Sequence, residues 1–177
     1  MICKPSKRAN LITQAYSDIH KADDWMMAYG EFLVAPFDGQ AVDIITDENI
    51  YDEFWQGFER GYGIVMRNEE GLNVLYWHCL QAFPVNKLQP IKRGQVVAQA
   101  GNSGFCYSGG VLVKNEDKLK PPYPGTHLHR EAFYNNPDGT RTYINPMTIT
   151  DLSIPISYNV LDAIKAVLEK IMSWFKK

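Results

Sequence analysis

Short stretches of alternating hydrophobic and polar residues recur along this chain, at intervals of about ten residues, as far as residue 150. Successive side chains of a β-strand point to opposite faces, so this alternation predicts half-buried strands. Strands are predicted at residues 9–16, 31–35, 40–45, 64–68, 72–78, 95–100, 127–134 and 141–144. Helical periodicity is almost absent from this part of the chain, which therefore predicts an all-β domain.

Glycine and proline residues mark the connections between these strands. Residues 36–39 (PFDG) are predicted to turn with a positive φ at the Asp-Gly pair, and residues 69–71 and 135–139 are predicted to close hairpins. Residues 47–60 are charged and aromatic without alternation, which indicates a loop with at most a turn of helix. Residues 105–124 form a long excursion, whose prolines are predicted to exclude regular structure and to fix an extended approach to residue 127.

The C-terminal residues have a different pattern. Apolar residues recur there at helical spacing, which predicts an amphipathic helix over residues 158–176. The apolar set is Leu161, Ile164, Val167, Leu168, Ile171, Met172, Trp174 and Phe175. The charges between them exclude a membrane-spanning segment, so we expect the helix to pack on the β domain, on a partner protein such as a second copy, or on a membrane surface. The chain thus divides into a domain at residues 1–150 and a linker with a helix at residues 151–177.

Composition and charge narrow the classes of function. The chain has 177 residues, enough for one domain with a substantial core. Its formal net charge of −2, without a basic patch among aromatic residues, argues against nucleic acid as a partner. The three cysteines, Cys3, Cys79 and Cys106, form no Cys-x-x-Cys pair, so each is predicted to be a free, buried thiol.

The candidate chemistry lies in the four histidines and one aspartate. Residues two apart on a strand share a face, so His127 and His129 are predicted to project into one space. Imidazole is the commonest metal ligand, and His20 stands four residues before Asp24, a spacing that lets both side chains meet on one centre. Taken singly, each signal also fits a surface histidine pair, a solvated aspartate-rich turn or, for His78 at the end of a predicted strand, a half-buried histidine.

Together these residues are sufficient for a zinc hydrolase. Such an enzyme needs three protein ligands and one open position for water. It also needs a group that takes and returns a proton, and donors for the oxyanion that forms on the substrate. Four histidines and one aspartate fill these roles with no residue left over.

The same residues resemble those of the M23 zinc metallopeptidases of the LytM and lysostaphin type. The resemblance rests on His20-x-x-x-Asp24, on residues 75–78 (LYWH) and on His127-x-His129, in this order. Further family landmarks lie between these blocks, at residues 34–39 (VAPFDG), 61–63 (GYG), 92–95 (KRGQ) and 101–104 (GNSG). The matching region runs from about residue 9 to residue 147, nearly all of the predicted β domain.

This resemblance implies a fold, a chemistry and a substrate class. The fold would be the family's antiparallel β-sheet core, of the duplicated-hybrid-motif type, with a groove between loops. His20, Asp24 and His129 would bind Zn²⁺, while His78 and His127 would be the catalytic pair that activates water and stabilises the tetrahedral intermediate. The substrate would be the peptide stems or cross-bridges of bacterial peptidoglycan.

Several positions depart from the family pattern or leave it open. Asp23 adjoins Asp24 and is the alternative ligand, although the spacing favours Asp24. Ala22 replaces a glycine, and Arg130 replaces an apolar residue on the face of its strand opposite to the histidines, where it should leave the site intact. The excursion at residues 105–124 is longer than typical and is expected to form one wall of the groove, where loops tune specificity.

Two other functions share the implied fold. A non-catalytic wall-binding, regulatory or virion structural module would have lost ligands or catalytic histidines, whereas this chain keeps them all. A phosphocarrier of the glucose-type sugar-transport kind would use paired histidines and leave Asp24 unexplained. The N-terminal residues lack the apolar run of a signal peptide, so we expect synthesis in the cytoplasm and action at the bacterial cell wall, as in phage-encoded or lysis-associated family members.

Overall fold

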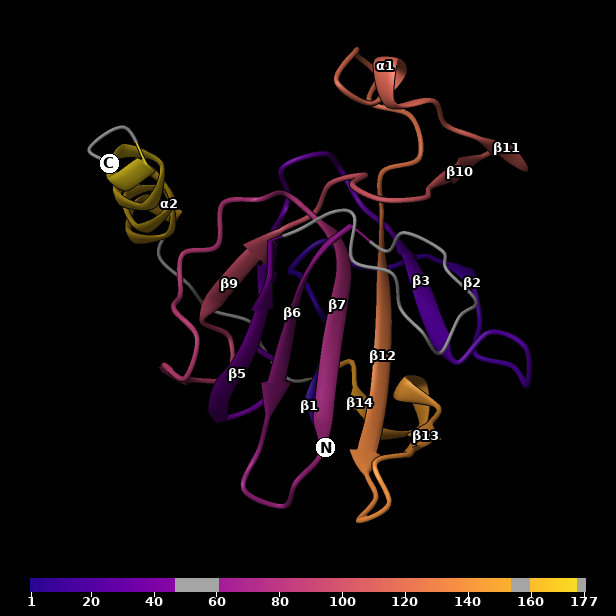
Figure 1. Ribbon diagram of the computed structural model, residues 1–177, viewed down its shortest axis with the longest axis vertical. Helices are drawn as coiled ribbons and strands as arrows, with labels where there is room; N and C mark the ends of the chain where they lie inside the picture. Colours follow the sequence, from indigo (N-terminus) through magenta and orange to yellow (C-terminus); the bar gives the residue numbers. More distant parts are fainter. Residues whose placement is uncertain (47–60, 154–159, 175–177) are drawn as a thin grey trace.

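An antiparallel β-sheet forms the centre of the protein (Figure 1). The computed structural model describes residues 1–46, 61–153 and 160–174, so the predicted loop at 47–60 lies outside the described residues. The order across the sheet is β2 (Ile12–Gln14), β3 (Ala22–Met26), β12 (His127–Asn135), β7 (Asn73–Cys79), β6 (Tyr62–Arg67), β5 (Gly39–Ile45) and β8 (Pro90–Ile91), with β13 (Arg141–Ile144) also paired to β12. The prediction of a mainly β fold is confirmed.

Smaller elements surround this sheet. The strand pairs are β4 (Phe32–Val34) with β9 (Val96–Gln99), β10 (Tyr107–Ser108) with β11 (Val111–Leu112), and the parallel pair of β1 (Ile2–Cys3) with β14 (Thr150–Asp151). The helices are α1 (Asn115–Lys118), the 3-10 helix η2 (Pro146–Ile149) and α2 (Val160–Trp174). The prediction of no regular structure in the excursion was therefore wrong for β10, β11 and α1, because its prolines gather at 121–124, beyond these elements.

The main core lies between one face of the large sheet and the β4–β9 pair. Trp25, Tyr76 and Leu128 come from neighbouring strands of the sheet and are almost fully buried against Leu33 and Val97. The Tyr76 hydroxyl donates a hydrogen bond of 3.0 Å to the carbonyl of Val34. Burial of each large apolar side chain contributes about 1.5–3 kcal/mol, so this layer holds the sheet that carries the histidines.

The pairing of β3 with β12 separates two kinds of chemistry onto the two faces of the sheet. His129 lies opposite Asp24, and Arg130 lies opposite Asp23. Arg130 and Asp23 are both 0% exposed, and the guanidinium donates to both carboxylate oxygens, at 2.9 and 2.6 Å. Trp25 Nε1 donates to the same carboxylate at 3.0 Å. The prediction that Arg130 points away from the histidines is confirmed.

Gly39 is required for a reason other than the predicted one. Its φ is not positive, and residues 36–39 connect strands that pair with other partners, β4 with β9 and β5 with β6 and β8. A Cβ atom at Gly39 would collide with the carbonyl of Arg67 on the neighbouring strand. Close approach of two backbones, and not left-handed conformation, therefore explains this glycine.

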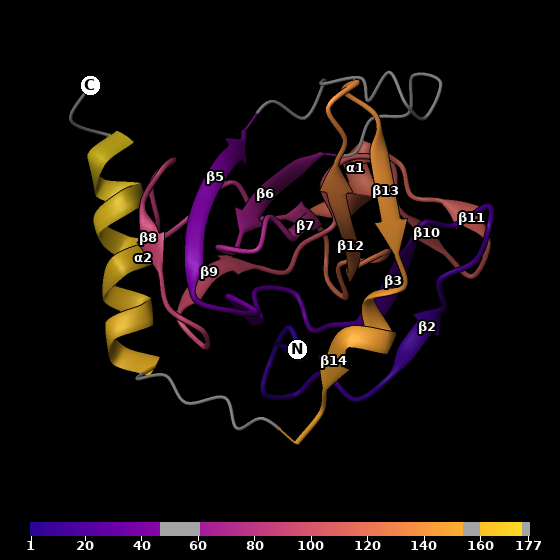
Figure 2. The same ribbon diagram turned by 90° about the horizontal axis from the view of Figure 1, so that it is seen from below.

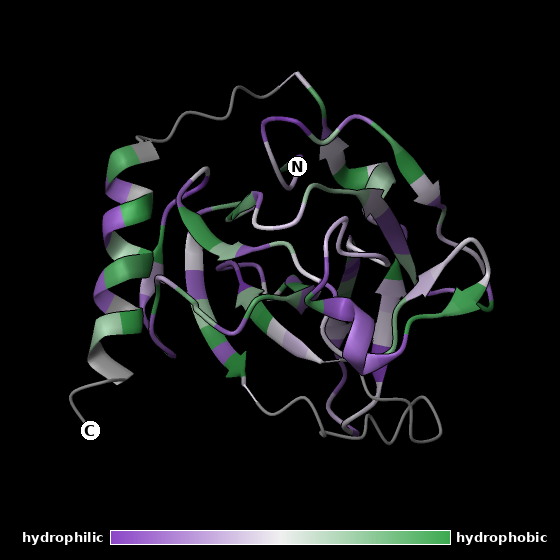
Figure 3. Cartoon of the chain, turned by 90° about the horizontal axis from the view of Figure 1, so that it is seen from above, coloured by the Kyte–Doolittle hydropathy of each residue, from purple (hydrophilic) through white to green (hydrophobic). Residues whose placement is uncertain are grey.

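Helix α2 confirms the predicted amphipathic helix, whose ends at 158, 159, 175 and 176 lie outside the described residues. Hydrophobic and polar residues alternate in bands along α2 (Figure 3), which lies to one side of the β-sheets (Figures 1 and 2). Val167 is buried and Ile171 is partly buried, whereas Leu161, Ile164, Leu168 and Met172 are exposed. Among the described helices none is long and apolar enough to cross a membrane.

Replacement of Asp23 by asparagine should destabilise the fold strongly. The variant leaves the buried Arg130 guanidinium without its counter-charge, at a cost of about 3–5 kcal/mol in the free energy of unfolding. A matched control is Asp43→Asn, which breaks the exposed Lys87–Asp43 pair of 2.7 Å. Denaturant unfolding should show a much smaller change for Asp43→Asn, and equal changes for both variants would contradict this account.

Candidate functional site

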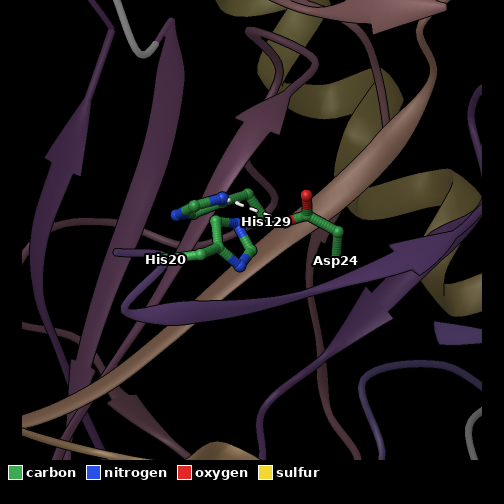
Figure 4. Close-up of side chains that lie close together, drawn as sticks. All are labelled: His20, Asp24 and His129. Carbon is green, nitrogen blue, oxygen red and sulfur yellow. Dashed lines mark ion pairs between the residues drawn. The ribbon is translucent and has the colours of Figure 1, made fainter. Parts of the chain in front are cut away.

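Three side chains from two segments meet on one face of the large sheet. His20 lies in the loop before β3, Asp24 lies on β3, and His129 lies on β12 (Figure 4). The Asp24 Oδ1 atom is 3.0 Å from His129 Nδ1 and 3.4 Å from His20 Nε2. The imidazoles of His20 and His129 stand edge to face, with ring centroids 5.0 Å apart. The antiparallel register of β3 and β12 is what brings the aspartate against the histidine.

The structure places Asp24, and not Asp23, in this cluster. Neighbouring residues of β3 face opposite sides of the sheet. Asp23 therefore pairs with Arg130 on the core face, while Asp24 lies on the other face with the histidines. The alternative of Asp23 as a ligand therefore has no support in this geometry.

The cluster fits a divalent metal ion. Oδ1 of Asp24 is buried and makes no hydrogen bond of good geometry with any described residue, although two imidazole nitrogens lie close to it. A tetrahedral zinc site with bonds of about 2.1 Å has ligand atoms about 3.4 Å apart. The contacts of 3.0 and 3.4 Å agree with that spacing, and His20, Asp24 and His129 are the group of metal-ligating side chains found among the described residues.

The charges of the cluster favour the ionised form of Asp24, which is the form that binds a metal. Burial alone would raise the pKa of Asp24, but His129 and His20 outweigh burial and hold that pKa well below its usual value. Burial would lower the pKa of His129, but the carboxylates of Asp24 and Glu131 reverse this effect and raise it. Asp24 is therefore ionised at every pH at which the protein would act.

His78 reaches the same face of the sheet through an irregularity in β7. The register of β6 and β7 shifts between Tyr62 and Ile64, which indicates an extra residue in β7. His78 has a positive φ of 60°, a conformation that costs a non-glycine residue about 1–3 kcal/mol. Regular alternation would place His78 on the core face with Tyr76. The bulge instead turns its side chain into the groove beside His127.

His78 and His127 form a second pair of imidazoles, with ring centroids 4.5 Å apart. His78 Nδ1 is 2.7 Å from the carbonyl of Ser103, and His127 Nδ1 is 2.8 Å from the carbonyl of Gly125. A carbonyl only accepts, so each Nδ1 carries the proton and each Nε2 is left with a free lone pair in the neutral ring. Burial lowers the pKa of both histidines, which keeps both rings neutral near pH 7.

A groove of about 750 Å³ contains both sets of side chains. Phe105, Tyr107, Gly109 and Gly110 from the excursion line it, so the prediction that the excursion forms one wall is confirmed. The Asn102 amide ties the two ends of the excursion together, because it donates to the carbonyls of Lys118 and Pro124 at 2.9 Å each. The other lining residues outside the two histidine sets are Thr13, Gln14, Met26, Ser108, Gly125 and Thr126.

The cysteines are free and buried, as predicted. Cys106 lies closest to the chemistry, with its Sγ 3.4 Å from His78 Nδ1. Burial raises the pKa of this thiol to about 12, so it stays protonated and is a poor metal ligand.

Two partners of the site residues were missed by the sequence reasoning. The Ser103 carbonyl, which orients His78, is a backbone atom that leaves no signal in the sequence. Glu131 lies 3.3 Å from His129 Nε2. It could have been found from the period of the strand, because it stands two residues after His129 on the same face.

No protein-family model and no curated protein matches this sequence. Among solved structures, a zinc-containing peptidase from Vibrio cholerae is 20% identical, with a TM-score of 0.55 over 84% of this chain and 39% of that one. The prophage-encoded M23 protein EnpA from Enterococcus faecalis is 18% identical, with a TM-score of 0.52 over 84% of this chain and 91% of that one. Lysostaphin from Staphylococcus simulans is 20% identical, with a TM-score of 0.52 over 79% of this chain and 47% of that one.

These similarities establish the fold. The chain has the β fold of the LytM-type M23 peptidases, as the resemblance in its sequence implies. The chain spans well under half of the Vibrio cholerae peptidase and nearly all of the Enterococcus faecalis catalytic domain.

The free energy of unfolding at acid pH should depend on His78. In the metal-free protein the folded-state pKa of His78 is depressed, so its stabilising contribution is complete above the unfolded value of about 6.5 and is lost as the pH falls below it. Between pH 6.5 and 5, the unfolding free energy of the wild type should fall more steeply than that of His78→Gln, by up to about 1.4 kcal/mol per pH unit. Chelator-treated samples unfolded by denaturant provide the measurement, and parallel profiles would contradict it.

Proposed function

We propose that this protein is a zinc-dependent endopeptidase that hydrolyses peptide bonds in the stems or cross-bridges of bacterial peptidoglycan. The observation that carries the proposal is the convergence, in one groove, of a His-Asp-His cluster with metal-site spacing and a pair of neutral histidines. The fold, shared with the peptidases named above, supports the same conclusion.

His20, Asp24 and His129 would hold Zn²⁺. When bound, this ion supplies a Lewis acid that makes water acidic near neutral pH and polarises a carbonyl. Three protein ligands leave one position open, as a catalytic site requires. Asp24 contributes one negative charge to the set, and the flanking histidines keep it ionised.

His78 and His127 are the proposed proton-transfer and charge-stabilising groups. Their backbone acceptors direct each Nε2 lone pair away from Ser103 and Gly125, and the groove contains both rings. One imidazole accepts the proton of the attacking water and returns it to the leaving amine. Once protonated at Nε2, that imidazole also donates to the oxyanion that develops on the scissile carbonyl, while the neutral ring of the other histidine offers an acceptor at Nε2.

Peptidoglycan peptide is the substrate that the sequence resemblance implies. The groove that would bind this peptide lies between the excursion and residues of the β2 edge. Residues 1–150 are proposed as the peptidase domain, and residues 151–177 as a linker and helix that docks to the domain, to a partner protein or to a membrane surface. Action at the cell wall in a phage or lysis context belongs to the same proposal, which a prophage-encoded neighbour supports.

Two histidine variants separate metal binding from catalysis. Wild-type protein should contain about one zinc per chain, release muropeptides from purified cell walls and lose activity with a chelator. His129→Ala should lose both zinc and activity. His127→Ala should keep its zinc and lose about 10²–10⁴-fold in rate, because only proton transfer and charge stabilisation are affected.

Zinc content by elemental analysis and muropeptides by mass spectrometry provide the readouts. Full activity in His129→Ala would contradict the assignment of His129 as a metal ligand. Zinc-free wild-type protein that still binds cell walls would favour the non-catalytic module, in which case neither variant would change wall binding.

A further inference from the structure

Glu131 is a buried carboxylate that the proposed chemistry does not use. It follows His129 by two residues on β12 and therefore lies on the same face of the sheet. It is 0% exposed, in the sheet beneath the His-Asp-His cluster. Beyond it on this face begins a second hydrophobic cluster, which contains Leu75, Trp77 and Phe133.

The contacts of Glu131 are with the histidine and with an indole. Glu131 Oε1 is 3.3 Å from His129 Nε2, and Trp77 Nε1 donates to the same oxygen at 3.3 Å. At its outer end, Arg141 Nη1 lies 3.8 Å from Glu131 Oε2. The Arg141 guanidinium also covers the ring of Phe133, at 4.3 Å from the centroid. Arg141 thus places a positive charge next to the far side of this carboxylate.

Both ring nitrogens of His129 consequently face a carboxylate. Nδ1 is 3.0 Å from Asp24 and Nε2 is 3.3 Å from Glu131. A proton on Nε2 satisfies Glu131 and leaves the Nδ1 lone pair directed at the metal cluster. The opposite tautomer would put a proton where a metal bond must form and would leave two acceptors facing each other at Nε2.

Stability alone does not account for a carboxylate at this place. Removal of a charge from water carries a large cost, and a well-packed apolar side chain beside Leu75, Trp77 and Phe133 would avoid it. A carboxylate that accepts the second N–H of a metal-ligating histidine, however, fixes the ring and strengthens it as a ligand.

We infer that Glu131 is a positioning residue that locks His129 with Nδ1 directed at the His20–Asp24 cluster and thereby sets the affinity of the site for Zn²⁺. The inference rests on the proposed function, because it requires that the cluster bind a metal. It adds that the affinity depends on a side chain that never touches the metal and that is supported in turn by Trp77 and Arg141.

The experiment measures zinc affinity, not activity, by competition with a chromophoric chelator. Glu131→Gln keeps the size of the side chain and one acceptor but removes the charge, so its zinc dissociation constant should rise about 10–100-fold. The matched control is Asp23→Asn, which removes an equally buried carboxylate from the opposite face of the same sheet. Asp23→Asn should lower stability and leave the zinc affinity of the folded protein unchanged.

The outcomes separate this inference from the proposed function. Failure of the wild type to bind zinc would overturn the proposed function. Zinc binding by the wild type, with equal affinity in Glu131→Gln or an equal loss in Asp23→Asn, would overturn the role of Glu131 alone. If Glu131→Gln does not fold, the variant Trp77→Phe tests the inference instead. Removal of the indole donor should weaken zinc binding, although by less than the loss expected for Glu131→Gln. Wild-type zinc affinity in Trp77→Phe would overturn the inference.

Discussion

The register between β3 and β12 is the constraint on which the rest of the structure depends. It places Asp24 against His129 on one face of the sheet and Asp23 against Arg130 on the other. A shift of one residue would exchange these faces, and would leave a buried arginine in the groove and a histidine in the core. The buried Asp23–Arg130 pair is compatible with this register and would be broken by a shift of one residue.

The second set of histidines depends on a local irregularity of the backbone. A regular β7 would direct His78 into the core, and the bulge with its left-handed residue turns it towards His127. The left-handed conformation of His78 costs energy, so its occurrence at the site fits a position selected for geometry and not for stability. The backbone carbonyls of Ser103 and Gly125 then fix both rings, so the excursion that begins and ends near these residues both shapes the groove and orients its chemistry.

Much of this arrangement could be predicted from the sequence, because the strands are long enough to alternate clearly and the metal-type residues stand at distinctive spacings. The period of a strand was sufficient to place His127 and His129 together and Arg130 behind them. Strands of two residues have no period, so β1, β8 and β14 were not predicted. The role of Gly39 was not predicted because its close approach to Arg67 is a tertiary contact. Glu131 was not predicted because its role depends on which nitrogen of His129 faces it.

The central claim is that His20, Asp24 and His129 form a three-ligand site with an open position, and X-ray absorption at the zinc edge of the zinc-loaded protein tests it most directly. The account predicts four-coordinate zinc with only nitrogen and oxygen neighbours, at about 2.0–2.2 Å, and the multiple scattering of two imidazoles. His129→Ala should lose the zinc, and with it the absorption edge. A sulfur neighbour at about 2.3 Å, or a spectrum unchanged in His129→Ala, would contradict the account.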